Sequence, residues 1–309
     1  MDKRPAFSIV VITYNPDWDK LRRTLNSILA QRFTDYEIVV TDDGSKDNKF
    51  NMIEAYFKQR QFTNYKLLPH DENHGTVKNL IAGTEAASGE YIRDFGPGDM
   101  FYARDTLGKV YKFMKDNDYH IVAGLPIGYS ITGDKRKAVP FSHPFDIEAY
   151  HKNDEKRILK NLILYSDMVC GANLSYEREF FLRYLHKIED RVVYAEDLIQ
   201  IVSAVEGDRV HFMPDRMIWY EVNTGNSAAN SSFKEALKKD VESVFDMLLE
   251  EHPNNKLLQK RASLNKYYKI DNIVLRTLAR SFTNPGQYVY LSRHYYQMLS
   301  GKHNPKDEK

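Results

Sequence analysis

Polar residues that could do chemistry follow several apolar runs of the chain. Tyr14 ends one run, Asp43 lies in the turn Asp42-Asp43-Gly44-Ser45 after another, and the segment Asp94–Asp99 follows a third. An aromatic ring can stack on a flat ligand, and an ionised carboxylate accepts hydrogen bonds from N–H donors. Because the ligand crevice of a doubly wound sheet lies beyond the carboxyl ends of its strands, we expect these residues to share one site.

The stretch from Asn73 to Asn79 has the features of an anion-binding turn. Gly75 lets the backbone approach a ligand, and the N-terminus of the helix that follows, together with Lys78, favours negative charge. A solvated lysine on a helix face is the alternative interpretation of Lys78.

Strands and helices must alternate to position these residues. Apolar runs predict strands over Phe7–Ile12, Glu37–Val40 and Tyr65–Leu68, with a fourth beginning at Gly89, and apolar residues at helical spacing predict helices between them. This alternation predicts an α/β fold, Rossmann-like, with a mostly parallel sheet flanked by helices.

The pattern changes in the second half of the chain. From about residue 100 to 228 it is mixed, and after the polar linker Ser227–Ser232 an amphipathic pattern predicts a helix that stops near His252-Pro253, followed by one or two more. We therefore expect a catalytic domain over residues 1–229, whose halves are about 1–100 and 101–229. A helical add-on over residues 230–309 would follow, with a disordered Lys-rich end after Gly301.

Composition excludes several classes of protein. Lys and Arg total 44 against 43 Asp and Glu, so no global basic field points to nucleic acid. The single cysteine, Cys170, excludes an intrachain disulfide and fits a reducing compartment, where it is expected to be a buried spectator. The N-terminus lacks a signal-peptide layout, and no apolar run approaches the ~20 residues that span a bilayer. We expect a cytoplasmic protein.

Four motifs in order resemble those of family 2 glycosyltransferases with the GT-A fold. They are Phe7 to Asn15, Val40 to Ser45, Asn73 to Asn79 with Gly89-Glu90-Tyr91-Ile92, and Ala195-Glu196-Asp197-Leu198. The resemblance covers roughly residues 6 to 225. It implies an inverting transfer of a hexose, glucose or galactose, from a UDP-sugar to an acceptor hydroxyl on a glycan or glycoprotein.

The resemblance also implies roles for single residues in binding the nucleotide. Tyr14 would stack on uracil, and Asp43 would accept a hydrogen bond from the imide of the base, whereas Asp42 would only close its turn. The alternatives are a tyrosine that caps the edge of the core and an acidic turn without a ligand. The full set expected at the nucleotide is Thr13, Tyr14, Asn15, Asp43, Asn73, Gly75 and Lys78.

Asp197 would be the general base that removes the acceptor proton. One carboxylate is enough for this role, because a nucleotide diphosphate is already a good leaving group. An acidic helix N-terminus would account for Glu196 and Asp197 equally well. By the same resemblance Gly171, Ala172 and Glu196 would line the acceptor floor, although a plain packing turn explains Cys170 to Asn173 nearly as well.

The chain departs from the family pattern at the expected metal site. Gly96 and Gly98 stand where acids would hold Mn²⁺ or Mg²⁺, and only Asp99 remains of the usual cluster. Hard cations need several oxygen ligands. Three arrangements are open: Asp99 binds the ion together with diphosphate oxygens and water, Asp94 is recruited, or Lys78 and backbone amides replace the metal.

Other functions stay open beside the enzymatic one. The lost acids suggest a non-catalytic subunit that binds a sugar nucleotide for a partner enzyme. A nucleotidyltransferase is a weaker alternative, because the phosphate-binding loop usual in such enzymes is absent after the first predicted strand. The basic and aromatic stretch from Lys256 to Tyr296 could contact a membrane surface peripherally, an acceptor protein or a second copy of the chain. It could also be a solvated face. Similar appended helices occur in bacterial enzymes that elongate glycans on serine-rich adhesins.

Overall fold

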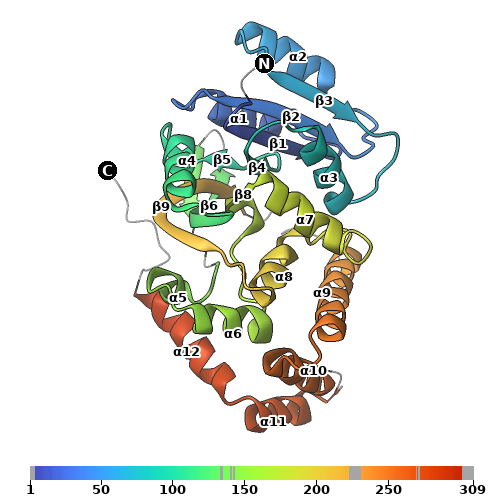
Figure 1. The fold of residues 1–309 in the computed structure, drawn as a ribbon, viewed down its shortest axis with the longest axis vertical. Coiled ribbons are helices and arrows are strands. Elements are labelled where there is room, and N and C mark those ends of the chain that lie inside the picture. Colours follow the sequence, from blue (N-terminus) through green and yellow to red (C-terminus); the bar gives the residue numbers. More distant parts are fainter. Residues whose placement is uncertain are drawn as a thin grey trace.

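The computed structural model describes residues 4–132, 135–139, 141, 143–222, 231–268, 270 and 272–300. These residues form one nine-stranded sheet covered by helices, with further helices at one end of the molecule (Figure 1). In this described part, no helix combines the length and the apolar content that crossing a membrane requires. The predicted polar linker and the predicted disordered tail lie largely outside the described residues.

The sheet has a parallel half and a mixed half. Its strands are β1 (Phe7–Thr13), β2 (Tyr36–Asp42), β3 (Tyr65–Pro69), β4 (Tyr91–Phe95), β5 (Met100–Phe101), β6 (Ile121–Thr132), β7 (Lys135–Val139), β8 (Leu174–Glu177) and β9 (His211–Glu221). They run in the order β3-β2-β1-β4-β8-β6-β9-β5, with β7 paired to β6. The strands from β3 to β4 are all parallel, as the alternation of strands and helices predicts.

Beyond β4 the sheet contains pairs that the sequence did not predict. Strand β8 runs antiparallel to both β4 and β6, and β5 runs antiparallel to β9, whereas β6 and β9 are parallel. The strands of each of these pairs are far apart in the chain, so no local sequence pattern predicts their pairing.

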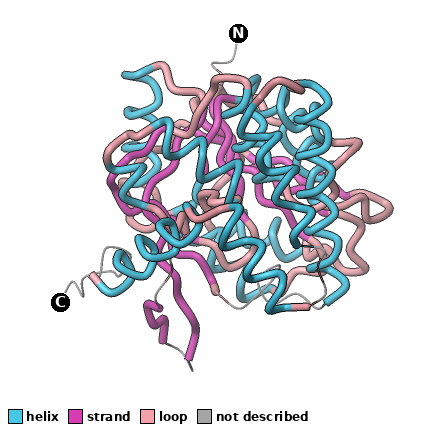
Figure 2. Tube along the Cα trace, turned by 90° about the horizontal axis from the view of Figure 1, so that it is seen from below, coloured by secondary structure: helices cyan, strands magenta, loops and turns pink. Residues whose placement is uncertain are grey.

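Helices cover both faces of the sheet (Figure 2). The helices of the described residues are α1 (Trp18–Leu29), α2 (Phe50–Gln59), α3 (Thr76–Ala86), α4 (Thr106–Asn117), α5 (Ile147–His151), α6 (Glu155–Tyr165), α7 (Arg178–Ile188), α8 (Ile199–Val205), α9 (Ser231–Glu251), α10 (Lys256–Tyr268), α11 (Ile273–Thr283) and α12 (Gly286–Leu299), of which α10 to α12 lie at one end of the molecule. The one or two helices expected after α9 are therefore three.

Two hydrophobic cores form because the central strands are apolar on both faces. Along β1, Ile9 and Val11 pack with α1, α2 and α4, while Val10 packs on the other face with α3 and α7. Such two-sided burial is what a β-branched run in a parallel sheet predicts. Helix α9 contributes Val244 and Leu248 to the second core, so the first helix of the predicted add-on shares the core of the sheet.

The register of the parallel strands aligns their carboxyl ends. Thr13 at the end of β1 lies opposite Asp42 at the end of β2, and its hydroxyl donates a hydrogen bond of 2.7 Å to Asp42 Oδ2. Asp42 also accepts hydrogen bonds from the backbone N–H and the hydroxyl of Ser45 at 2.8 and 2.6 Å. Asp42 therefore closes the turn after β2, as expected, and leaves Asp43 as the acid that faces the cleft.

Candidate active site

A cleft of about 760 Å³ lies at the carboxyl ends of β1, β2 and β4. Its far wall is formed by the loop that leads into α8 and by Leu237 and Val241 of α9. The cleft brings together eight residues of the site predicted from sequence: Thr13, Tyr14, Asp43, Asp99, Gly171, Ala172, Glu196 and Asp197. Residues 43 and 197, which are far apart in the chain, thus line one cavity.

Four other predicted residues do not line this cleft. Asn15, Asn73, Gly75 and Lys78 are absent from its walls, and Thr76 and Asn79 of α3 line it instead. The first turn of α3, which was expected to face the ligand, therefore faces the cleft with Thr76 and Asn79, while the Lys78 side chain is exposed to solvent. Asn15 helps to hold the neighbouring turn, since its side chain accepts a hydrogen bond from Lys46 N at 3.3 Å.

Gly75 supports the site from behind. Its φ of 90° is one that residues with side chains rarely adopt, and a Cβ atom there would collide with Val193 Cγ1. Val77 also contacts this residue, because its backbone N–H donates a hydrogen bond of 3.1 Å to Val193 O. Gly75 thus lets the start of α3 pack against the loop that carries Glu196 and Asp197.

Asp43 anchors the start of α3 and faces the cleft at the same time. Its Oδ1 accepts a hydrogen bond of 2.8 Å from His74 N, and its Oδ2 accepts one of 3.0 Å from Gly75 N. Each carboxylate oxygen has two lone pairs, so one lone pair on each oxygen remains for a ligand. Tyr14 lines the same part of the cleft with 56% of its surface exposed, which leaves its ring available for stacking.

Four further carboxyl groups line the cleft, of which Asp94 and Asp99 are buried and Glu196 and Asp197 are partly buried. Burial raises the pKa of Asp197 to about 6, and burial with the neighbouring acids Asp197 and Asp94 raises the pKa of Glu196 well above its usual range. Burial raises the pKa of Asp94 to about 6, and burial together with Asp94 raises the pKa of Asp99 to about 7. Shifts of this kind are common where acids do chemistry.

Gly171 lies directly against the two acids expected to face the acceptor. A Cβ atom on Gly171 would be 3.0 Å from Glu196 Oε1 and 3.2 Å from Asp197 Cβ. A larger residue would therefore push Glu196 or Asp197 out of place. The neighbouring Cys170 has a thiol whose pKa burial raises well above its usual value, which suits a spectator better than a nucleophile.

Two residues that support the site were missed by sequence reasoning. Arg93 is fully buried, and its guanidinium donates to Leu174 O at 2.7 Å and to Ala172 O at 2.5 Å, so it holds the predicted acceptor floor against β4. Asp240 of α9 accepts hydrogen bonds from three consecutive backbone N–H groups, those of Val193, Tyr194 and Ala195, at 3.2, 2.8 and 3.1 Å. A charged residue inside an apolar strand was the one available signal for Arg93, and nothing local marked Asp240.

The residues around Gly96 and Gly98 fit a cation with few side-chain ligands. Among the described residues, Asp94 Oδ1 is buried in the cleft without a hydrogen-bond partner, and the carboxyl of Asp99 lies beside it on the wall. Gly98 has a φ of 110°, and a Cβ atom there would collide with Glu221 Oε2. An acid at position 98 would therefore have a strained backbone and would require the Glu221 carboxylate to move, and Asp94 and Asp99 are the candidate ligands of the chain as it stands.

Glu221 itself is balanced by basic residues of α1. Its carboxylate forms ion pairs with Lys20 and Arg23, each at 3.4 Å. It therefore ties the end of β9 to α1 beneath the glycine turn.

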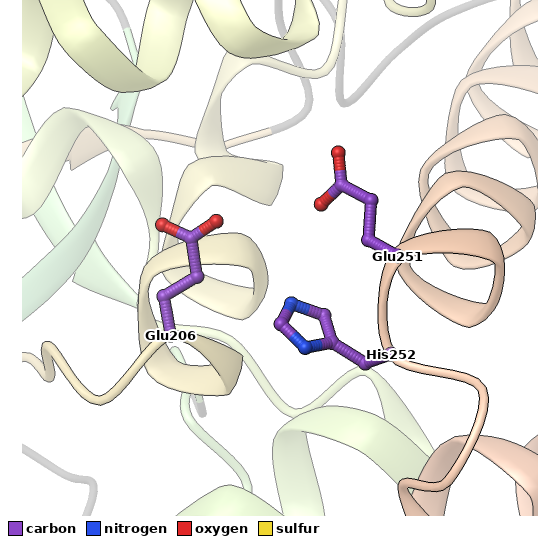
Figure 3. A group of neighbouring side chains, drawn as sticks. All are labelled: Glu206, Glu251 and His252. Atoms are coloured by element: carbon purple, nitrogen blue, oxygen red, sulfur yellow. The ribbon is translucent and has the colours of Figure 1, made fainter.

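A second group of possible metal ligands lies outside the cleft. Glu206 follows α8, and Glu251 and His252 lie at the end of α9; their ligand atoms lie within 4.8 Å of one another (Figure 3). Lys187 of α7 forms ion pairs with Glu206 at 2.5 Å and Glu251 at 2.8 Å. The ammonium of Lys187 already balances these carboxylates, so the group is not assigned to a metal. Its ion pairs instead join α7, α8 and α9.

The chain is similar in sequence to known glycosyltransferases. The family model described as glycosyl transferase family 2 matches residues 8–185. An uncharacterized glycosyltransferase of Haemophilus influenzae is 25% identical over 201 residues, which cover 64% of this chain and 79% of that protein. The poly(ribitol-phosphate) beta-N-acetylglucosaminyltransferase TarP of Staphylococcus aureus is 29% identical over 137 residues, 43% of this chain but only 39% of TarP.

Solved structures share the fold. S. aureus TarS 1-349 in complex with UDP-GlcNAc has a TM-score of 0.56 at 21% identity, covering 83% of this chain and 71% of that one. The mannosyltransferase PcManGT of Pyrobaculum calidifontis, in complex with GDP-Man and Mn²⁺, has a TM-score of 0.54 at 16% identity, covering 96% and 88%. These likenesses show a GT-A fold with a C-terminal helical region.

Proposed function

The chain belongs to glycosyltransferase family 2, and from this premise we propose that it moves glucose or galactose from a UDP-sugar to a hydroxyl of a glycan or glycoprotein, with inversion. The observation that carries this proposal is that Asp43 and Asp197 line the same cleft. A nucleotide held at Asp43 would then point its sugar toward Asp197. The proposed place of action is the cytoplasm.

At the nucleotide end, Tyr14 stacks on uracil and Asp43 accepts the imide N–H. The exposed face of the Tyr14 ring and the lone pairs that remain on Asp43 support these roles. Thr76 and Asn79 at the start of α3 line the path of the diphosphate, and the positive end of this helix favours its charge. The other residues proposed around the nucleotide are Thr13, Asn15, Asn73, Gly75 and Lys78, of which all but Thr13 act from behind or beside the wall.

Transfer is a single displacement in which Asp197 is the general base. Its carboxylate takes the proton of the acceptor hydroxyl as the hydroxyl oxygen forms a bond to the anomeric carbon. The bond from that carbon to the diphosphate oxygen breaks on the opposite face, and its electron pair leaves with UDP. Gly171, Ala172 and Glu196 line the floor on which the acceptor lies.

Asp99, with Asp94 beside it, would hold a divalent cation, Mn²⁺ or Mg²⁺. Such an ion would neutralise charge on the departing diphosphate when bound. Asp94 Oδ1 and the buried Asp99 carboxyl are the groups of this chain that suit it. The partners proposed are thus a sugar nucleotide and a glycan or glycoprotein, with the C-terminal helices as the place for peripheral membrane contact or self-association.

The test is release of UDP from candidate UDP-sugars in the presence of acceptor glycans, with and without a chelator. Asp197→Asn should lower turnover by ~10²- to 10⁴-fold, as loss of a general base does, while binding of UDP stays the same. Asp190→Asn, the same change at an exposed acid seven residues earlier, is the matched control. Undiminished turnover by Asp197→Asn would remove the assignment of the base.

A second candidate function rests on the missing acids. Because Gly96 and Gly98 replace the acidic cluster, the chain could bind a sugar nucleotide on behalf of a partner enzyme without turning it over. Calorimetric binding of UDP with no release from any donor would favour this function.

A further inference from the structure

Helix α12 buries two polar side chains and exposes several apolar ones. Its buried residues are Tyr290, His294 and Gln297, whereas Val289 and Tyr296 are exposed and Leu299 is 89% exposed. A helix at the surface of a water-soluble domain normally buries its apolar face.

The orientation of α12 is set by specific contacts with the body of the protein. Gln297 Nε2 donates to Asp146 Oδ1 at 3.0 Å, and Gln297 Oε1 accepts from Glu148 N at 3.2 Å. Tyr290 also stacks on Tyr165 of α6, with ring centroids 4.3 Å apart. Turning the helix to bury its apolar face would break these contacts.

Helix α11 presents a second apolar face to solvent. Leu275, Leu278 and Phe282 follow one another at helical spacing, and all three are exposed, Phe282 to 84%. Helices α11 and α12 follow each other in the chain and form one edge of the molecule (Figure 1). This pair of exposed faces, hereafter the α11–α12 face, has no counterpart among the helices that cover the sheet within the described residues.

The charge of the chain segment that contains α11 and α12 is strongly one-sided. The segment from Lys256 to Ser300 contains eight Lys and Arg residues and one acid, Asp271, whereas the whole chain has 44 basic and 43 acidic residues. Arg293 lies exposed on α12 among the apolar side chains. The rest of the chain has more acidic than basic residues, so the segment that contains α10, α11 and α12 carries the net positive charge.

We propose that the α11–α12 face docks on an anionic membrane surface. Exposed apolar and aromatic side chains enter the interface between headgroups and acyl chains, while basic residues pair with lipid phosphates. Tyrosines such as Tyr295 suit this level of a bilayer, because their rings are apolar and their hydroxyls polar. The proposal concerns a surface outside the cleft and holds whichever sugar is transferred.

A second copy of the chain is a poorer occupant of this face. Two copies that met through their α11–α12 faces would bring together two segments, Lys256 to Ser300 of each copy, that hold eight basic residues and one acid each. Like charges brought together in this way oppose association. An anionic bilayer supplies the missing negative charge.

The experiment is sedimentation of the full chain with vesicles of phosphatidylcholine alone or mixed with phosphatidylglycerol. We expect binding only to the mixed vesicles, and we expect it to be lost when salt is raised to about 1 M, where the Debye length is about 3 Å. Phe282→Ser with Leu299→Ser should weaken binding about tenfold or more, because each side chain would bury its apolar surface in the bilayer. Arg293→Gln should weaken it roughly fivefold.

Matched controls and a second measurement decide the outcome. Met52→Ser and Lys58→Gln make the same kinds of change on exposed positions of α2 and should leave binding unchanged. Circular dichroism and UDP release should be the same for all variants. Absent binding, equal binding to both vesicles, or a dimer in light scattering that Phe282→Ser with Leu299→Ser abolishes would overturn the proposal.

Discussion

At the scale of single residues, the cleft contains several carboxyl groups that are buried or partly buried. Burial raises the pKa of Asp197, Glu196 and Asp94, and the charge of Asp197 raises the pKa of the other two further. A base must be ionised to accept a proton, and a raised pKa makes the ionised form a stronger base once it is present. If these acids take part in the transfer, we expect the pH dependence of turnover to follow their ionisation.

The pH dependence of kcat/KM should show this directly. Because burial raises the pKa of Asp197 to about 6, the base is ionised above that pH and protonated below it. We expect kcat/KM to be constant above about pH 7 and to fall about tenfold per pH unit below about pH 5, with the midpoint between. The measurement is the rate of UDP release across this range. A rate that stays constant down to pH 4 would contradict the role of Asp197.

Asp94 should lower the stability of the fold at neutral pH. Burial raises its pKa from the usual value of 3.8 to about 6, so the unfolded chain loses this proton at lower pH than the folded chain. The contribution of Asp94 to the free energy of unfolding therefore decreases as pH rises from about 4 to about 6 and stays low above that.

Asp94→Asn removes this ionisation. We expect the free energy of unfolding at pH 8, measured by urea denaturation with chelator present, to rise by about 1–3 kcal/mol relative to the parent chain. The difference should vanish near pH 4. A variant less stable at pH 8 would mean that the charge of Asp94 has a structural partner.

At the scale of elements, the loop before Asp197 is held by a helix from the far end of the chain. Asp240 of α9 binds the backbone of Val193 to Ala195, and Gly75 lets α3 pack against Val193. The loop is thus fixed from two sides. Since a shift of about 1 Å at a reacting group can cost on the order of 100-fold in rate, these contacts should matter for turnover.

Asp240→Asn should lower kcat without a comparable change in KM for the UDP-sugar. The amide places an N–H₂ group where one of the accepting oxygens faced backbone N–H groups, so the loop loses part of its support. We expect kcat to fall by roughly tenfold or more, by the same cost of misplacing a reacting group, because Tyr14 and Asp43 keep the nucleotide. Asp246→Asn, at an exposed position of the same helix, is the control. Equal effects on kcat and KM would argue for general loss of structure.

At the scale of the whole molecule, α9 packs into one of the two hydrophobic cores of the sheet. Val244, Phe245 and Leu248 lie in the core that α3, α7 and α8 also build, and Figure 1 shows α9 beside α7 and α8. Each fully buried apolar side chain stabilises the fold by about 1.5–3 kcal/mol. The contribution of three such side chains is comparable to the free energy of unfolding of a whole domain, which is ~5–15 kcal/mol.

A chain cut after residue 229, at the predicted boundary, should therefore fail to fold cooperatively. A chain cut after residue 268 keeps α9 and α10 and should still unfold in one transition. Thermal unfolding followed by near-ultraviolet circular dichroism compares the two. If the shorter chain melts as sharply and at the same temperature as the full one, α9 is a dispensable addition.

The parallel part of the sheet and the nucleotide-binding part of the predicted site follow from sequence, because both depend on local patterns. The apolar runs specify β1 to β4, and the carboxyl ends of parallel strands must meet at one edge, so the sequence by itself places Tyr14 and Asp43 together. Asp197 could be added only through the resemblance of its motif. The strands β5 to β9 are short or mixed in character, and their pairing is not written in any one segment.

Only the tertiary structure decided which groups support these residues. The contacts of Arg93 with the acceptor floor, of Asp240 with the loop before Asp197, and of Glu221 with the space beside Gly98 join residues far apart in the chain. The apolar side chains that α12 exposes are likewise not predicted by periodicity, which finds an apolar stripe but not which side of the helix packs against the protein. A sequence pattern reports how residues repeat along one element, whereas burial and hydrogen bonding depend on what another element brings against it.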